Sequence, residues 1–450
     1  MKWLPWLLLW ALPLLSRAAP LFRDGERWLA VGDSITHNGE YTAWIYLYYA
    51  TRFPDTRVEV QNGGIAGDTV AGALLRYEHD LRDRQPTVAT ILLGMNDVQR
   101  RLYGEQPPTP ALLAARAGAL ARYETGLAEL VRRFKADDIP VILMTPSPYD
   151  ETARLPSLPQ TGVNEALAAC SGTIRRLAGK ERLAVIDLHG PMTELGLRLQ
   201  TAEESATIIG PDRIHPKGPG HLVIAYFFLK AQGAPALVSR VELDAHGGRV
   251  TGAVKAEVRH WQATPEKVKF DLLADALPFP VPEEAREALK WVPFMDDLNR
   301  EELQVRGLER GTYELRIDEE PVGVFSSGEL ARGINLADRA TPQRKQAGEV
   351  LDQVREWRRL TAFHERLMVQ VERMAPLNGL QRPVEYPEAA RRLAAAETPE
   401  GYRARLIARY LKAKPQEKEI HEKVQRLRET IRRLARPKER RYRLLRRDPP

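Results

Sequence analysis

Five short apolar runs, separated by longer stretches, dominate the first half of the chain. The runs cover residues 28–31, 58–60, 88–93, 141–144 and 183–186, and helical stretches span residues 110–134 and 164–180. Continuous apolar runs that alternate with helices are typical of parallel strands buried on both faces of a sheet. The pattern therefore predicts an α/β fold over this half of the chain.

The pattern changes beyond about residue 235, where apolar and polar residues alternate with the period of a strand. Residues 238–243 and 249–254 flank a glycine-rich turn and predict a β-hairpin. The same alternation returns in residues 268–272, 312–317 and 322–325, and a helical stretch at residues 282–298 interrupts it. We expect a small β-rich module here.

From about residue 341 the chain has a helical pattern. Its clearest part is a row of apolar residues at 4-3-4-3 spacing: Ile420, Val424, Leu427, Ile431 and Leu434. This amphipathic face either packs against the body of its own chain or pairs with a second copy. Two heptads are short for a lasting coiled coil, which favours packing within the chain.

The first nineteen residues differ from the rest. Lys2 precedes an apolar stretch at residues 3–15, and the small residues among Ser16, Arg17 and Ala18 suit cleavage, so we expect a signal peptide and a secreted or periplasmic protein. An uncleaved anchor is the alternative, although the stretch is shorter than the roughly twenty residues that span a bilayer. Cys170 is the single cysteine, and it cannot form a disulfide within the chain.

The length of 450 residues exceeds the usual range of one domain. The patterns together predict four segments: the signal peptide at residues 1–19, an α/β domain at 20–235, the β-rich accessory module at 236–340 and a helical, basic region at 341–450. The sequence gives no oligomeric state.

Basic charge is concentrated at the end of the chain. Residues 401–450 hold 18 Lys and Arg against 6 Asp and Glu, a net charge of 18 − 6 = +12, whereas residues 1–400 carry 49 − 54 = −5. The pattern slightly favours a solvated helix face over any specific ligand. If the region does bind a polyanion, a signal peptide points to an acidic polysaccharide, lipopolysaccharide or an anionic membrane surface, and no nucleic acid is expected.

Three residues have the chemistry of an acyl-transfer site. A serine hydroxyl is a weak nucleophile and needs a histidine base that a carboxylate orients, and Ser34, His215 and Asp212 supply these groups. The oxyanion of the intermediate needs donors, for which the backbone N–H groups of Ser34 and Gly67 and the amide of Asn96 are candidates. Because these three donors each follow a predicted strand, they are expected to meet at the carboxyl end of the sheet.

For residues near the catalytic candidates we expect structural or substrate-binding roles. Asp33 is expected to fix the turn before Ser34 by hydrogen bonds to the backbone. His37, Asn38 and Tyr149 follow predicted strands and are candidates for lining the substrate pocket.

Other kinds of catalytic site find less support. The chain has no Gly-x-Ser-x-Gly nucleophile elbow. Its nine histidines show no His-Glu-x-x-His pair and its one cysteine cannot build a thiolate site, so no metal site is predicted.

The motifs occur in the order Gly-Asp-Ser-Ile-Thr at residues 32–36, Gly67, Gly-Met-Asn-Asp at residues 94–97 and Asp-Arg-Ile-His at residues 212–215. In this order the chain resembles the SGNH or GDSL hydrolases, in a secreted bacterial form with a C-terminal extension. The resemblance covers roughly residues 25–232. It implies a flavodoxin-like three-layer α/β/α sandwich with a five-stranded parallel sheet, serine esterase activity, and no metal or organic cofactor.

The sequence indicates the type of reaction more clearly than it indicates the substrate. The family that the chain resembles includes carbohydrate acetyl esterases, lysophospholipases, lipases and thioesterases on one fold. We expect removal of O-acetyl groups from a polysaccharide, because the chain has a predicted signal peptide and an accessory module. A lipid-ester hydrolase is the alternative enzyme, and a non-catalytic protein that binds glycans or the cell envelope is the alternative of another class.

Overall fold

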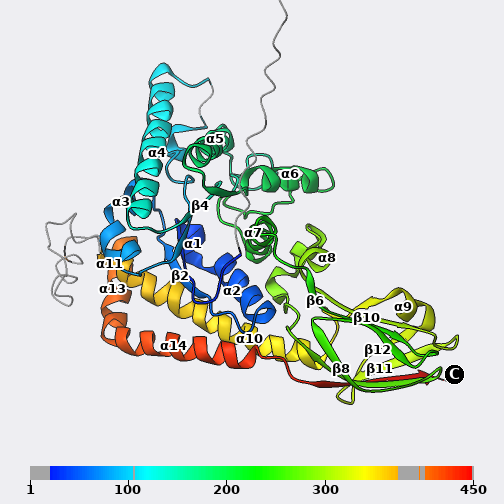
Figure 1. Ribbon diagram of the computed structural model, residues 1–450. Helices are drawn as coiled ribbons and strands as arrows, with labels where there is room; N and C mark the ends of the chain where they lie inside the picture. The colour runs from blue at the N-terminus through cyan, green and yellow to red at the C-terminus, as the bar shows by residue number, and fades with distance from the viewer. Residues whose placement is uncertain (1–20, 105–106, 373–394, 396–400, 448–450) are drawn as a thin grey trace, which may run out of the picture.

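The computed structural model describes residues 21–104, 107–372, 395 and 401–447 (Figure 1). The predicted signal peptide, residues 1–19, lies outside the described residues. In the part of the chain that is described, no helix is both long enough and apolar enough to cross a membrane.

The first sheet contains five parallel strands in the order β2-β1-β3-β4-β5. Their bounds are β1 (Arg27–Gly32), β2 (Glu59–Gly64), β3 (Val88–Leu92), β4 (Val141–Met144) and β5 (Ala184–Ile186). Each contains one of the five apolar runs or overlaps it. The predicted α/β fold with a five-stranded parallel sheet is confirmed.

Helices cover both faces of this sheet. Trp28 and Ala30 pack with one set of helices, whereas the alternate residues Leu29 and Val31 pack with the other. The first set is α2 (Glu40–Arg52), α6 (His189–Gln200) and α7 (Gly218–Ala231). The second set is α3 (Val70–Leu75), the π-helix η1 (Tyr77–Arg82), α4 (Pro110–Ala136) and α5 (Val163–Glu181). Two short helices, α1 (Ser34–Asn38) and the 3-10 helix η2 (Arg100–Leu102), follow β1 and β3.

Two further sheets form the β-rich module. One has the order β13-β10-β6-β7 and the other β12-β11-β14-β9-β8. Their strands are β6 (Leu237–Asp244), β7 (Arg249–Val254), β8 (Ala256–Thr264), β9 (Lys267–Ala274), β10 (Arg300–Arg306), β11 (Thr312–Ile317), β12 (Glu320–Ser326), β13 (Ile334–Asn335) and β14 (Arg440–Arg447). The short helix α9 (Ser327–Arg332) packs on β10. The predicted hairpin is the pair β6 and β7.

The stretch predicted as a helix at residues 282–298 is a 3-10 helix, η3 (Glu283–Lys290), followed by α8 (Phe294–Leu298). Ala285, Phe294 and Leu298 are buried in the same core as α2 and α7. This segment lies within the stretch assigned to the accessory module, but it packs on the α/β domain.

The last strand corrects the prediction that residues 341–450 are helical. β14 lies inside the third sheet and pairs with β11 on one side and β9 on the other. In Figure 1 it is the red strand that runs among the green and yellow ones. Tyr442 and Leu444 point into the module's core and are buried there, which accounts for the strand.

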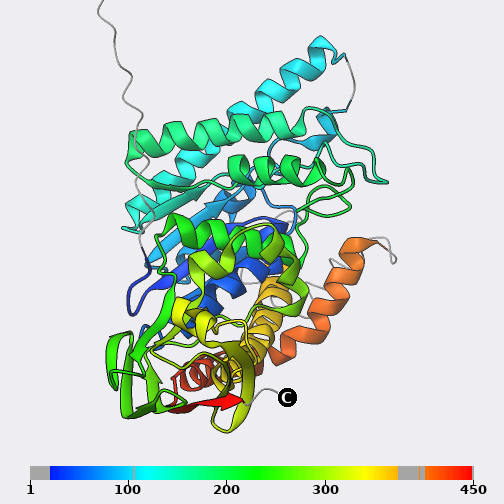
Figure 2. The same cartoon turned by 90° about the vertical axis from the view of Figure 1, so that its right-hand side faces the viewer.

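The remaining C-terminal helices lie outside α2 and beside the end of β2. They are α10 (Pro342–Leu360), the π-helix η4 (Thr361–Glu365), α11 (Arg366–Glu372), α13 (Tyr402–Ala413), the 3-10 helix η6 (Lys414–Gln416) and α14 (Glu417–Leu434). α10 packs against both α2 and α14. In Figure 2 the α10, α13 and α14 helices lie on the opposite side of the first sheet from α4 and α5. Ile420, Val424, Leu427 and Ile431 are buried in the core with α10, so the amphipathic face packs within its own chain.

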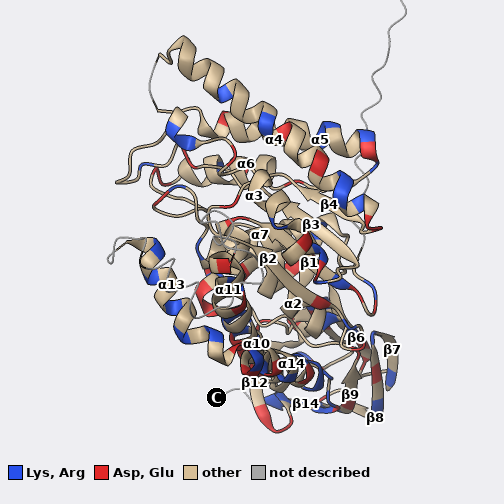
Figure 3. Ribbon diagram, turned by 90° about the vertical axis from the view of Figure 1, so that its left-hand side faces the viewer, with Lys and Arg blue, Asp and Glu red and all other residues tan. Residues whose placement is uncertain are grey.

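Many charges of the basic C-terminal region have acidic partners elsewhere in the chain. Figure 3 marks the charged residues along the ribbon. Such pairs include Arg428–Glu59, Lys423–Glu356, Arg440–Asp318, Arg443–Glu319, Arg446–Glu309 and Arg447–Glu314. Acidic residues of the first 400 positions therefore form ion pairs with basic residues of the last fifty positions of the same chain.

Candidate active site

Ser34 stands at the carboxyl end of β1, as the first residue of α1. Asp33 caps this helix, because its Oδ1 accepts a hydrogen bond of 3.0 Å from the backbone N–H of Ile35. Burial, together with the nearby carboxyl groups of Asp97 and Asp68, raises the pKa of Asp33 to about 7. The contacts of Asp33 are thus with the turn that presents Ser34, as the sequence predicts.

Ser34, His215 and Asp212 form a chain of hydrogen bonds. Ser34 Oγ lies 2.8 Å from His215 Nε2, and His215 Nδ1 lies 2.6 Å from Asp212 Oδ2. The side chains of His215 and Asp212 are about half exposed, so the site opens to solvent. This arrangement can accept a proton from the serine hydroxyl and stabilise the imidazolium that results.

The loop before α7 fixes the orientation of Asp212. Its Oδ1 accepts hydrogen bonds from the backbone N–H groups of Ile214, at 3.1 Å, and His215, at 3.0 Å. Burial raises the pKa of Asp212, but the hydrogen bonds from His215 outweigh it, so the pKa lies below its usual value. Asp212 is therefore held as a carboxylate that faces the histidine.

Arg213 anchors the loop before α7 through hydrogen bonds of its side chain. This role was not predicted from the sequence. Its buried guanidinium donates to the backbone carbonyls of Asp150, at 2.9 Å, and Ala153, at 3.0 Å, and also to that of Ser157. Its backbone has a φ of 66°. These bonds connect the loop that carries His215 to the segment after β4.

The three candidate oxyanion donors follow neighbouring strands, because β1 lies between β2 and β3. Gly67 is exposed and has a φ of 74°, a backbone conformation that favours glycine. Asn96 Nδ2 donates to the backbone carbonyl of Asp68 at 2.9 Å. Since an amide nitrogen carries two hydrogens, this bond leaves the second one for another acceptor.

The predicted pocket residues have different surroundings. His37 Nδ1 accepts from the backbone N–H of Ala66 at 2.9 Å, which holds the loop after β2 against α1. Both the backbone carbonyl and the side-chain oxygen of Asn38 accept hydrogen bonds from Arg358 of α10. Ser34, His37, Asn38 and Ala66 together form one wall of a cavity of about 240 Å³.

Tyr149 corrects a prediction. It is 3% exposed, packs in the core between the sheet and α5, and is not among the residues that line the cavity beside Ser34. Its hydroxyl accepts a hydrogen bond of 3.0 Å from the backbone N–H of Gln160. Burial in this core is the physical reason that Tyr149 supports the loop after β4 instead of facing a substrate.

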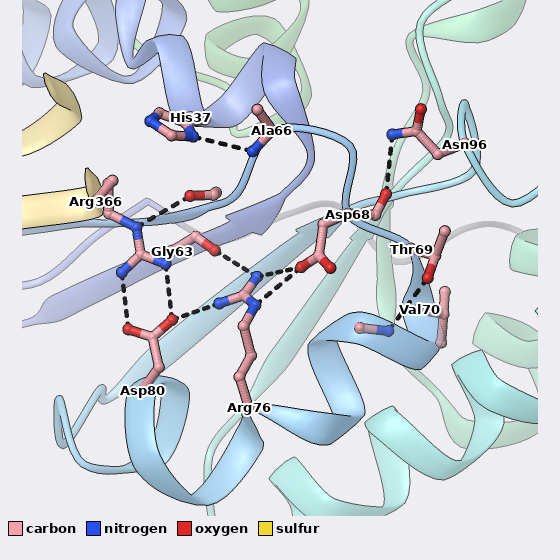
Figure 4. A network of polar contacts seen from close by, with 12 residues as sticks. His37, Gly63, Ala66, Asp68, Thr69, Val70, Arg76, Asp80, Asn96 and Arg366 are labelled. Carbon is pink, nitrogen blue, oxygen red and sulfur yellow. Dashed lines mark hydrogen bonds and ion pairs between the residues drawn. The ribbon is translucent and has the colours of Figure 1, made fainter. Parts of the chain in front are cut away.

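A buried ionic cluster lies beneath the loop that carries Gly67 (Figure 4). Arg76 donates to Asp68 at 2.9 Å, to Asp80 and, at 2.7 Å, to the backbone carbonyl of Gly63. Arg366 of α11 donates to both carboxylate oxygens of Asp80 at 2.7 Å and to the backbone carbonyl of Gly64 at 3.0 Å. The C-terminal helices are thus bonded directly to the end of β2.

The protonation of this cluster follows from its charges. Burial alone would raise the pKa of Asp80, but the guanidinium groups of Arg366, Arg84 and Arg76 hold that pKa well below its usual range. Asp80 is therefore a carboxylate that binds three cations. Nothing in the local sequence distinguishes Arg366 from the other arginines of the region, so sequence reasoning missed it.

Glycine is required where β2 approaches α1. A Cβ atom on Gly64 would lie 2.2 Å from the backbone nitrogen of His37, a distance at which the backbone must move. The close approach lets the loop after β2 reach the helix that begins with Ser34. The glycine pair at residues 63–64 is thus part of the site's construction.

Comparison with known proteins agrees with this architecture. The profile of the GDSL-like Lipase/Acylhydrolase family matches residues 30–223. An acetylxylan esterase of Geobacillus stearothermophilus is 27% identical over 232 residues, which span 48% of this chain and 98% of that enzyme. The solved structure of a gut microbial diltiazem-metabolizing enzyme matches with a TM-score of 0.88 at 28% identity, covering 96% of this chain and 100% of the other.

The last match is nearly as long as the chain, so it includes the β-rich module and the C-terminal helices. The resemblance to the SGNH or GDSL hydrolases is confirmed by the family profile, which contains all the motifs named above. The protein is a carboxylic ester hydrolase, and its residues 30–223 are a GDSL-like lipase/acylhydrolase domain.

Proposed function

We propose that Ser34 is the nucleophile of this ester hydrolase, that His215 is its general base and that Asp212 orients His215. The observation that supports these roles is the pair of hydrogen bonds from Ser34 Oγ to His215 Nε2, at 2.8 Å, and from His215 Nδ1 to Asp212 Oδ2, at 2.6 Å. A hydroxyl in such a chain loses its proton to the imidazole as it attacks.

In the first half of the reaction, Ser34 Oγ forms a bond to the carbonyl carbon of the ester while its proton moves to His215 Nε2. The bond between that carbon and the alcohol oxygen then breaks, and His215 gives the proton to the departing alcohol. In the second half, water attacks the acyl-enzyme and loses a proton to His215. The bond to Ser34 Oγ breaks, His215 returns the proton to Ser34, and the carboxylic acid leaves.

The oxyanion is proposed to accept hydrogen bonds from the backbone N–H groups of Ser34 and Gly67 and from the free hydrogen of the Asn96 amide. These donors are in place before the negative charge develops, so they stabilise the transition state more than the substrate. A donor of this kind typically contributes about 3 kcal/mol.

The proposed substrate is an O-acetyl ester of a polysaccharide. A cavity of about 240 Å³ beside Ser34 favours a short acyl group, since sites for drug-sized ligands usually have about 300–1,000 Å³. The acetylxylan esterase among the relatives supports the same class of substrate.

The test is hydrolysis of p-nitrophenyl esters with acyl chains from acetate to dodecanoate, with acetylated xylan and acetylated pectin as competitors. We expect a preference for acetate, competition by a glycan, and loss of turnover in Ser34→Ala. A preference for long chains would move the substrate to lipid esters. Turnover that does not depend on Ser34 would contradict the proposed nucleophile, and no turnover at all would favour a protein that binds glycans or the envelope.

We also propose that the protein acts outside the cytoplasm, in the periplasm or the medium, on the basis of the apolar stretch at residues 3–15. N-terminal sequencing of the protein from cell fractions tests this, and a cytoplasmic protein that retains Met1 would contradict it. Binding of the basic C-terminal region to a polyanion is a weaker proposal, because pairs such as Arg443–Glu319 and Arg447–Glu314 already neutralise part of its charge.

A further inference from the structure

The cavity beside Ser34 has a second wall, which comes from residues far beyond the matched family domain. This wall consists of Phe363 of η4, Leu367 and Gln370 of α11, and Tyr402, Leu406 and Arg409 of α13. The profile match ends at residue 223, so none of these residues belongs to it. Six of the ten residues that line the cavity beside Ser34 are therefore supplied by the C-terminal helices.

The second wall is firmly attached to the α/β domain. Arg358 bonds to Asn38, the last residue of the helix that begins with Ser34, and Arg366 bonds to Asp80 and to the end of β2. α11 and α13 pack on each other through a small core that contains Leu367 and Leu406. The wall is thus a fixed part of the site, and it can distinguish one substrate from another.

Two aromatic side chains of this wall remain open to solvent. Tyr402 is 60% exposed and Phe363 is 40% exposed, although both are large apolar groups. The guanidinium of Arg358 lies over the Phe363 ring at 5.9 Å, and Gln370 Nε2 donates to the Tyr402 hydroxyl at 3.4 Å, so both rings have neighbours that position them. Exposed rings in a cavity offer a flat apolar surface on which the C–H face of a sugar ring can stack.

Arg409 supplies a positive charge to the same cavity. Its side chain is exposed, and within the described residues it makes no hydrogen bond or ion pair. Lys414 is paired with Glu372, and both Arg359 and Lys423 are paired with Glu356. The guanidinium of Arg409 therefore keeps its planar set of donors, which matches a carboxylate.

We propose that the second wall binds the alcohol half of the substrate, with sugar rings against Tyr402 and Phe363 and a uronic acid carboxylate on Arg409. Arg409 is then a specificity-determining residue that favours acetylated acidic polysaccharides over neutral ones. This inference rests on the proposed function, because it needs Ser34 to be the nucleophile.

The experiment compares kcat/KM for an acetylated galacturonan oligosaccharide with kcat/KM for an acetylated xylo-oligosaccharide. For the wild-type protein we expect the acidic substrate to be preferred. Arg409→Gln should reduce that preference about tenfold to a hundredfold, mainly through KM, as loss of a charge-assisted hydrogen bond does. Arg409→Lys should retain part of it.

Lys412→Gln is the matched control, since Lys412 is an exposed cation on the same helix that does not line the cavity. It should leave the preference unchanged. An equal preference in wild type and Arg409→Gln, or a wild-type protein that favours the neutral oligosaccharide, would overturn the inference. Hydrolysis of p-nitrophenyl acetate by Ser34→Ala at the wild-type rate would instead overturn the proposed nucleophile, so the two failures are distinguishable.

Discussion

Asp80 and Arg366 lie 286 positions apart in the chain and share two hydrogen bonds of 2.7 Å, with both side chains buried. Asp80 belongs to η1 of the α/β domain, and Arg366 begins α11. The bond therefore joins the helices that complete the cavity to the segment that follows the Gly67 loop. A contact in this position affects both stability and the geometry of the site.

Asp80→Asn should destabilise the protein by about 3–5 kcal/mol, because it leaves the buried guanidinium of Arg366 without a counter-charge. Urea unfolding measures the loss. The double variant Asp80→Asn/Arg366→Met should cost less than the sum of the single variants, as expected for two groups in direct contact.

The control for this pair is Arg355→Met, which breaks the more exposed pair with Glu284 and should cost less than about 1 kcal/mol. Additive losses in the Asp80 and Arg366 variants would show that the two residues do not depend on each other.

Asn96→Ala should lower kcat on p-nitrophenyl acetate by about a hundredfold to a thousandfold with a small change in KM, because the amide contributes mainly in the transition state. Thermal unfolding of the variant provides the control, since Asn96 also bonds to the backbone of Asp68. A loss below tenfold in a folded variant is incompatible with a role at the oxyanion.

Glu301→Gln should make the protein's stability less dependent on pH. Glu301 is buried in β10, where one carboxylate oxygen accepts from Gln343 at 2.7 Å and the other has no partner among the described residues. Burial raises the pKa of Glu301 from its usual 4.5 to about 7. The folded protein consequently holds this proton more tightly than the unfolded chain does.

The sign follows from that difference in proton binding. Below pH 4.5 Glu301 is protonated in both the folded and the unfolded state. As the pH rises from 4.5 to about 7, the unfolded chain loses this proton while the folded protein keeps it, so the free energy of unfolding of the wild type falls by up to about 3 kcal/mol. The glutamine variant does not show this fall. Urea unfolding between pH 4.5 and 8 measures the widening gap. Glu349→Gln, at an exposed position of α10, should show a constant difference, and a constant difference for Glu301→Gln would disprove the assignment.

A chain that stops after Pro437 should lose the order of the β-rich module, because β14 lies between β11 and β9. Limited proteolysis should cut this variant within residues 256–326 and spare a matched chain that stops after Arg447. Equal resistance of the two chains would mean that the sheet forms without its inner strand.

The strands of the first sheet were predictable because each is buried on both faces. A residue such as Ala30 or Ile91 has helices above or below it, so the strand leaves a continuous apolar run in the sequence. β14 leaves no such run. Its sequence alternates arginines with Tyr442 and Leu444. Arg443 pairs with Glu319 in the turn between β11 and β12, and Arg447 pairs with Glu314 on β11. Pairing at such separations is not visible in a local pattern.

The same limit applies to the site. The positions of Ser34, Gly67 and Asn96 were predictable because each follows a strand of one sheet, and the contact between His215 and Asp212 was predictable from their spacing. The second wall was not, since Tyr402 and Arg409 reach the cavity only through the packing of α10 on α2 and of α11 on β2. Tyr149 was misplaced for the related reason that sequence gives no measure of its burial.

The position of β14 also orders events during synthesis. When residue 186 has been translated, every strand of the catalytic sheet is present, and that sheet can begin to form while the chain is still growing. β9 and β11 cannot complete their sheet until residues 440–447 have been synthesised, because these residues insert between them. During synthesis there is therefore an interval in which the esterase fold has formed while β9 and β11 each have an unpaired edge. Unpaired edges can pair with other chains, so the need for chaperones is greatest in this interval.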